Sequence, residues 1–344
     1  HINTDKGTRG LGELNPSVRR ADELGTLRQM AETLIGRDPR QIEKLHALFD
    51  PASLDRIGFR ALSALDQAFW DILGKSLDAP VHALLGGACR DEIRLYANIN
   101  RATRGDRSPE AFARNATAAV SDGFDAIKLA PFDGLARGID KAEDAADGIA
   151  CMQAVRQAIG PNVDLLIDCH SHFTAKGALA VAKALADLDL FWFEEPVPDE
   201  DIAGYLEVKA KSGLPIAGGE SRMHRRGFWQ ACNDNILDIA MPDVTIVGGI
   251  CELKKVAAMA EARGIRTAPH GPFGPVTTAS SVHAMAAHPA FTILEYAWGE
   301  VPWRPTLTLP NEKISNGRIT LPQTPGLGIE LDEKIVAAHR IAIT

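Results

Sequence analysis

The first part of the chain alternates apolar and polar residues and then changes to a helical pattern. Residues 1–14 alternate around an Asp-Lys-Gly turn, which predicts a β-hairpin. The partner strands of such a hairpin normally lie further upstream, so we expect residues before His1. From Leu24 to about Leu85 the apolar residues recur at helical spacing, with Gly and Pro between the stretches. Residues 1–88 are thus predicted to form an α+β capping domain, or lid.

Short β-rich runs separated by helical stretches follow Gly86 and Gly87. We expect eight strands, at residues 92–99, 126–131, 163–170, 190–197, 215–220, 237–244, 266–271 and 291–297. A strand-and-helix repeat of roughly 25 residues that continues for eight units favours a (β/α)8-type barrel over a doubly wound sheet. We assign the barrel to residues 89–298. Two extended pieces, 316–322 and 325–329, are expected to rejoin the N-terminal sheet, so that the tail 299–344 returns to the capping domain.

Composition and charge narrow the class of protein. Hydrophobic residues make up 45% and charged residues 24% of the 344-residue chain, which excludes a disordered or coiled-coil protein. The formal net charge is -8 without a basic cluster, so we expect no nucleic-acid partner. No apolar run is long enough to span a membrane and no signal segment opens the chain, so we expect a cytoplasmic protein. Five cysteines without a C-x-x-C spacing read as reduced thiols.

Polar residues recur at the carboxyl ends of the predicted strands, where the active sites of such barrels lie. Three acidic residues end consecutive strands at intervals of one β/α unit, and they would repel one another unless they shared a cation. Any one of them could instead cap the next helix or pair with a lysine. Carboxylate ligands suit Mg²⁺ first and Mn²⁺ second. The predicted metal ligands are Asp168, Glu194 and Glu220.

Two histidines accompany these acids. Asp243 and His270 end neighbouring strands, so a carboxylate–imidazole hydrogen bond would orient the ring and raise its basicity. His170 lies two residues after Asp168 and shares its face of the strand. Its strand is four positions from that of His270, so one imidazole is expected on each side of a bound substrate. His172 is expected to be solvated or to lie behind the first layer of the site.

Other charged residues lie at or near the carboxyl ends of the predicted strands. Lys128 is the one charge in its strand and points to the same rim, unless it is a snorkelling or ion-paired lysine. Glu295 on the last strand would donate a hydrogen bond if it is protonated, or it would brace a base. Glu195 should face away from the site if its strand continues. Arg222 and Arg226 are expected to be surface residues rather than substrate contacts.

These residues and intervals resemble the enolase superfamily, specifically its mandelate racemase branch. The stretches that carry the resemblance cover nearly the whole chain: SALDQAFWDILGKSLDAPVHALLGG, FWFEEPV, PIAGGE, MPDVTIVGGICE, TAPHGPFGP and PGLGI. The resemblance implies that Asp168, Glu194 and Glu220 bind the metal and that Asp243 and His270 form the dyad. It also implies a homo-oligomer, and a loop around Gly10 to Ser17 that closes over a carboxylate substrate.

One departure from the branch is informative. Its racemases carry K-x-K on the second strand, whereas here Lys128 is followed by Leu129 and Ala130, so the second lysine base is absent. In its place is the D-x-H sequence that ends at His170, which resembles galactonate dehydratase and related acid-sugar dehydratases. The connection between the second and third strands is also long, which is expected to affect specificity.

The sequence therefore predicts an Mg²⁺-dependent dehydratase of a small-molecule sugar acid, an aldonate or aldarate. His270 would remove the α-proton to form a metal-stabilised enediolate, and His170 would protonate the departing 3-hydroxyl, giving a 2-keto-3-deoxy acid. Lys128 and Glu295 would assist at the carboxylate. A cycloisomerase or an epimerase/racemase acting in the same site is the alternative. A class I aldolase using Lys128 as a Schiff base and a barrel kept for binding or structure remain further possibilities, although the intact ligand set argues against the latter.

Overall fold

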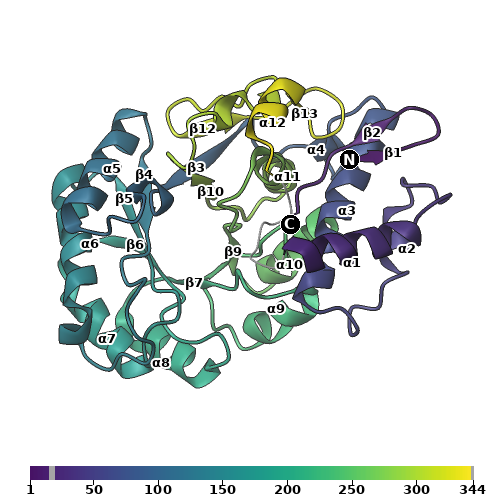
Figure 1. The fold of residues 1–344 in the computed structure, drawn as a ribbon. Coiled ribbons are helices and arrows are strands. Elements are labelled where there is room, and N and C mark those ends of the chain that lie inside the picture. The colour runs from purple at the N-terminus through teal and green to yellow at the C-terminus, as the bar shows by residue number, and fades with distance from the viewer. Residues whose placement is uncertain (15–19, 342–344) are drawn as a thin grey trace.

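The computed structural model describes residues 1–14 and 20–341, and the barrel is its central part (Figure 1). Eight parallel strands form one curved sheet with the order β10-β3-β4-β5-β6-β7-β8-β9. An isolated bridge between Thr267 and Phe291 links β9 to the segment that precedes β10. The strands are β3 (Glu92–Asn98), β4 (Ala126–Leu129), β5 (Asp164–Asp168), β6 (Leu190–Glu194), β7 (Ile216–Gly218), β8 (Ile239–Ala240), β9 (Arg266–Thr267) and β10 (Leu294–Ala297).

Helices follow the strands and cover the outside of the curved sheet, as Figure 1 shows for α5 to α10. A continuous apolar core fills the space between the sheet and these helices, and it includes Leu129, Ile167 and Phe193. The helices are α5 (Pro109–Ser121), α6 (Ala146–Ile159), α7 (Ala175–Ala184), α8 (Ile202–Ser212), α9 (His224–Asn233), α10 (Gly249–Glu261) and α11 (Pro275–Ala286), with short 3-10 turns η1 (Arg101–Thr103), η2 (Ala142–Ala145) and η3 (Ala186–Leu188). The predicted barrel fold is confirmed. No helix in the described ranges is both long enough and apolar enough to cross a membrane.

In the described ranges 1–14 and 20–88, the N-terminal domain contains the predicted hairpin and four helices. Its central helix α3 begins after Asp55, whose side chain accepts a hydrogen bond from the backbone of Gly58. It packs against both α1 and α10, so this domain sits on the side of the barrel (Figure 1). The elements are β1 (Ile2–Asn3), β2 (Arg9–Gly10), α1 (Arg20–Glu32), α2 (Ile42–His46), α3 (Arg56–Ser76) and α4 (Val81–Leu84).

The tail contacts the barrel and the N-terminal domain at different points. Residues 316–322 were expected to join the N-terminal sheet, but β12 pairs antiparallel with barrel strand β3 instead. The hairpin strands β1 and β2 are two residues each and pair with one another. Gly326 bridges to Pro80, so the second extended piece does reach the N-terminal domain. The elements are η4 (Arg304–Thr306), β11 (Thr308–Leu309), β12 (Arg318–Thr320), β13 (Glu330–Leu331) and α12 (Glu333–His339).

One buried carboxylate joins three distant segments. Asp71 on α3 is fully buried and accepts hydrogen bonds from the backbone N–H of Leu11 at 2.9 Å and of Leu327 at 2.8 Å. The ammonium group of Lys75 lies 2.8 Å from the same carboxylate. Asp71 therefore fixes the hairpin and the tail to the central helix of the N-terminal domain.

Replacing Asp71 by Ala should destabilise the protein strongly, because it leaves two buried N–H groups and part of an ion pair without an acceptor. We expect a loss of about 3–5 kcal/mol in the free energy of unfolding. Urea denaturation would measure it. The matched control is Asp38→Ala, because Asp38 pairs with Arg40 on the surface. This substitution should lower the free energy of unfolding by less than about 0.5 kcal/mol. Equal losses in the two variants would contradict this role.

Candidate active site

The predicted site residues at the carboxyl ends of the strands follow a layer of apolar side chains inside the barrel. The interior of the barrel contains Ala126, Leu166 and Trp192 on three adjacent strands. Side chains two positions apart on a strand share a face, so the residue that follows each of these by two also points inward, at the carboxyl end. Those three residues are Lys128, Asp168 and Glu194, and all are buried.

Lys128 lies among three of the predicted acidic residues. Its Nζ atom is 2.8 Å from Glu194, 3.0 Å from Glu295 and 3.4 Å from Asp168. The indole Nε1 of Trp192 also donates to Glu194 at 3.0 Å. Because burial without a partner is costly for any of these charges, Lys128 acts as an internal counter-charge for the cluster.

The pKa values of the acidic residues are shifted in different directions. Burial, with the nearby charge of Asp168, raises the pKa values of Glu194 and Glu220. Burial also opposes ionisation of Asp168, but the cationic His170 and Lys128 outweigh it and lower the pKa of that carboxyl. For Glu295, Lys128 and His270 likewise outweigh burial and lower the pKa to about 2. Ionisation is thus disfavoured at Glu194 and Glu220 and favoured at Asp168 and Glu295.

His270 forms the predicted pair with Asp243. The Nδ1 atom of the ring lies 2.8 Å from Asp243, whose other oxygen accepts bonds from the N–H and the hydroxyl of Thr245, both at 2.7 Å. The second ring nitrogen lies 3.3 Å from Glu220 and 3.7 Å from Glu295. Burial lowers the affinity of the ring for a proton, but these carboxylates outweigh it and raise the pKa of His270 to about 10. The ring is therefore held in a fixed orientation at the acidic cluster.

His170 has a partner that the sequence did not reveal. Its Nδ1 atom lies 2.5 Å from Asp133, and its Nε2 atom lies 3.1 Å from Asp168. Asp133 is in the long connection after β4 and also contacts Arg107 at 3.1 Å. Asp168 is the main cause that raises the pKa of His170 to about 12. Two Asp–His pairs therefore border the cluster, from β5 and β9, which are four apart in the strand order.

The candidate metal ligands are only partly grouped. Ligand atoms of Asp168, His170 and Glu220 lie within 4.8 Å of one another. Glu194 is not in that group, and its carboxylate instead accepts hydrogen bonds from Lys128 and Trp192. All eight predicted site residues nevertheless lie in one connected set of contacts, while their individual roles stay predictions.

The placement of four neighbouring residues agrees only in part with the predictions. Glu195 was expected to face away, but the backbone turns there with φ +40° and its carboxylate is buried, with Oε1 lacking a hydrogen-bond partner. Burial and Glu220 raise the pKa of Glu195 to about 8. His172 is buried against the carbonyl of Ala136, so of its two expected placements the solvated one is wrong. Arg222 pairs with Asp199 at 2.9 Å and its side chain is only 10% exposed, whereas Arg226 is exposed as expected.

The predicted closing loop, Gly10 to Ser17, is described as far as Leu14, and residues 15–17 lie outside the described residues. Within the described part, the carboxylate of Glu13 accepts hydrogen bonds from the N–H groups of Gly274 at 2.6 Å and Thr277 at 3.0 Å. These two residues lie at the start of α11, in the segment that follows His270. The base of the loop is therefore attached to the same segment as the candidate base.

Comparison with known families accounts for both parts of the chain. Residues 1–86 match the N-terminal domain of the mandelate racemase/muconate lactonizing enzymes, and residues 111–335 match the enolase C-terminal domain-like family. The second match covers more than half of the chain and includes the site residues from Lys128 to Glu295.

Individual relatives agree with these matches. The D-gluconate dehydratase of Thermoproteus tenax is 32% identical over 98% of this chain and 68% of its own length. The D-galactarolactone cycloisomerase of Agrobacterium fabrum strain C58 is 34% identical over 99% of this chain and 90% of its own length. A crystal structure of a mandelate racemase/muconate lactonizing enzyme from Jannaschia sp. CCS1 superposes with a TM-score of 0.89, at 34% identity, covering 99% of this chain and 92% of that one. The chain therefore belongs to the mandelate racemase/muconate lactonizing enzyme family of the enolase superfamily.

Proposed function

We propose that this enzyme is an Mg²⁺-dependent dehydratase that converts an aldonate or aldarate to a 2-keto-3-deoxy acid. The observation that carries the proposal is the pair of histidines, each held by its own aspartate, at the edge of one buried carboxylate cluster. Dehydration needs both a base and an acid, and two fixed imidazoles can supply them. Relatives named as sugar-acid dehydratases add support.

Asp168 and Glu220 lie close enough to share a divalent cation, and Glu194, which pairs with Lys128 here, would complete the proposed set of carboxylate ligands. Their burial and mutual repulsion raise the pKa values of two of them, which a bound cation would reverse. Oxygen ligands favour Mg²⁺, with Mn²⁺ as a substitute. When bound, the ion would stabilise the negative charge that develops on the substrate carboxylate as the α-proton leaves.

His270 is the proposed base. Asp243 holds its Nδ1 atom, so the Nε2 atom faces the cluster and can accept the α-proton. A base must first be neutral, and the charge of Glu220 opposes this as long as no cation balances it. Lys128 pairs with both Glu194 and Glu295, and its proposed role is to offset negative charge near the substrate carboxylate.

His170 is the proposed acid. It would donate a proton to the 3-hydroxyl as the C3–O bond breaks, so that water leaves and an enol remains, which then becomes the keto acid. Asp133 holds the ring through Nδ1 and directs Nε2 towards Asp168 and the interior of the site. Asp133 is thus a positioning residue rather than a catalytic one.

The second candidate is a cycloisomerase acting on a sugar-derived lactone. It is favoured by the 34% identity to a D-galactarolactone cycloisomerase. In that case the same base would act, but no water would be lost. The products separate the two functions.

We expect the purified enzyme with Mg²⁺ to release a 2-keto-3-deoxy acid from at least one member of a panel of aldonates and aldarates. A chelator should abolish the reaction and added Mg²⁺ should restore it. Colorimetric detection of the keto acid measures the outcome. Isomerised lactone without keto acid would favour the cycloisomerase, and full turnover after verified metal removal would exclude the metal-dependent mechanism.

Exchange of the α-proton in D₂O separates the roles of the two histidines. His270→Asn should lose both exchange and dehydration, since the base starts both. His170→Asn should retain exchange while dehydration falls by roughly 10²- to 10⁴-fold, the usual contribution of a general acid. NMR follows both processes.

His288→Asn serves as the control for this comparison, because His288 is also buried but its ring pairs with Glu261 on α10 rather than with a predicted site residue. It should leave both rates unchanged. If His170→Asn lost exchange and His270→Asn kept it, the roles would be reversed. Normal turnover in both variants would overturn the mechanism.

A further inference from the structure

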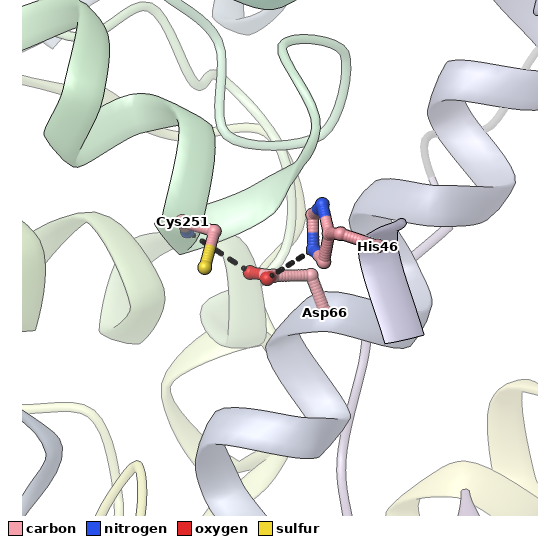
Figure 2. A group of neighbouring side chains, drawn as sticks. All are labelled: His46, Asp66 and Cys251. Carbon is pink, nitrogen blue, oxygen red and sulfur yellow. Dashed lines mark hydrogen bonds and ion pairs between the residues drawn. The ribbon is translucent and has the colours of Figure 1, made fainter. Parts of the chain in front are cut away.

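A second group of metal-binding side chains lies where the N-terminal domain meets the barrel. His46 is on α2, Asp66 on α3 and Cys251 in the first turn of α10, and the three side chains converge in Figure 2. One ligand atom from each of them lies within 4.8 Å of the other two. The spacing of the cysteines along the chain does not indicate this group, because its members are far apart in sequence.

Asp66 is at the centre of the group. Its Oδ1 atom lies 2.7 Å from Nε2 of His46, and its Oδ2 atom accepts a hydrogen bond from the backbone N–H of Cys251 at 3.3 Å. Asp66 is fully buried and Cys251 is 5% exposed. The side chain of His46 is 11% exposed, so the group is reached from the side of α2.

Glu43 offers a fourth ligand at that entrance. It lies one turn before His46 on α2, and its Oε1 atom is 3.7 Å from the sulfur of Cys251. Its side chain is 68% exposed and pairs with Lys255 at 2.8 Å. Lys255 also contacts Glu252 at 3.2 Å, so it would still have an acidic partner if Glu43 bound a metal ion instead.

We propose that His46, Asp66, Cys251 and Glu43 form a binding site for Zn²⁺, separate from the active site. Nitrogen, oxygen and thiolate ligands together are typical of zinc and unsuited to Mg²⁺. Tetrahedral zinc bonds of about 2.0–2.3 Å separate the ligand atoms by roughly 3.3–3.8 Å. The Cys251–Glu43 distance of 3.7 Å fits, and the His46–Asp66 pair has to open by less than about 1 Å.

Such an ion would fasten the N-terminal domain to the barrel. It would link α2 and α3 to α10, whose preceding segment contains Asp243, the partner of the candidate base. A hydrogen bond from the N–H of Gly248 to Ser63 at 3.0 Å already joins the same surfaces. The zinc site is therefore a structural one that stabilises the docked domain.

Cobalt absorption tests the proposal independently of activity. Co²⁺ is added to the intact protein in excess Mg²⁺, which occupies the oxygen ligands of the active site. Wild-type protein should gain the near-ultraviolet charge-transfer band of a cobalt–thiolate bond, at one Co²⁺ per chain. Added Zn²⁺ should remove the band, and it should raise the thermal unfolding temperature.

Cys251→Ser should lose the band and the thermal shift. Cys232→Ser is the matched control, since Cys232 is equally buried, at 2% exposed, and should keep both. His46→Gln provides a second test should Cys251→Ser fold poorly, and it should weaken Co²⁺ binding at least ten-fold. Absence of the band in wild-type protein, or its persistence in Cys251→Ser, would overturn the proposal, as would unchanged Co²⁺ affinity in His46→Gln.

Discussion

The structure depends on the burial of several negative charges at one end of the barrel. Asp168, Glu194 and Glu295 surround a single ammonium group, that of Lys128, at 2.8–3.4 Å. Burying charges in this way is costly unless each has a partner. Lys128 and two histidines offset part of this cost, but burial and the nearby Asp168 still raise the pKa of Glu194. A barrel built for stability alone would place apolar side chains here, so the cluster indicates selection for chemistry.

The rest of the fold holds this cluster in place. Register between β5 and β6 sets Asp168 beside Glu194, and the apolar layer beneath supports both. The N-terminal domain docks on the barrel where α3 packs against α10, and Asp71 fixes the hairpin and the tail to α3. Glu13 then connects the base of the closing loop to the start of α11. A few hydrogen bonds thus join the N-terminal domain to the tail and to the segment that follows His270.

Much of the fold and the site could be predicted because period-two patterns and repeated intervals fix which residues end each strand. Side-chain positions and contacts could not be predicted in segments where the backbone is irregular. The expectation that Glu195 faces away assumed that its strand continues, but β6 ends at Glu194 and the chain turns at φ +40° directly after it. Asp133 lies in an irregular connection without periodicity, so nothing linked it to His170 before the structure did. The pairing of β12 with β3 was also missed, since a three-residue strand carries too little pattern to identify its partner.

Calorimetric titration with Mg²⁺ is the most direct test that the carboxylate cluster is a divalent-metal site. We predict that wild-type protein binds Mg²⁺ and that Asp168→Asn binds it at least about ten-fold more weakly, because the change removes a ligand charge. Asp164→Asn is the matched control, since Asp164 lies at the opposite end of the same strand and pairs with Arg94. It should bind like wild type. Failure of wild-type protein to bind Mg²⁺, or equal affinities in all three proteins, would contradict the account.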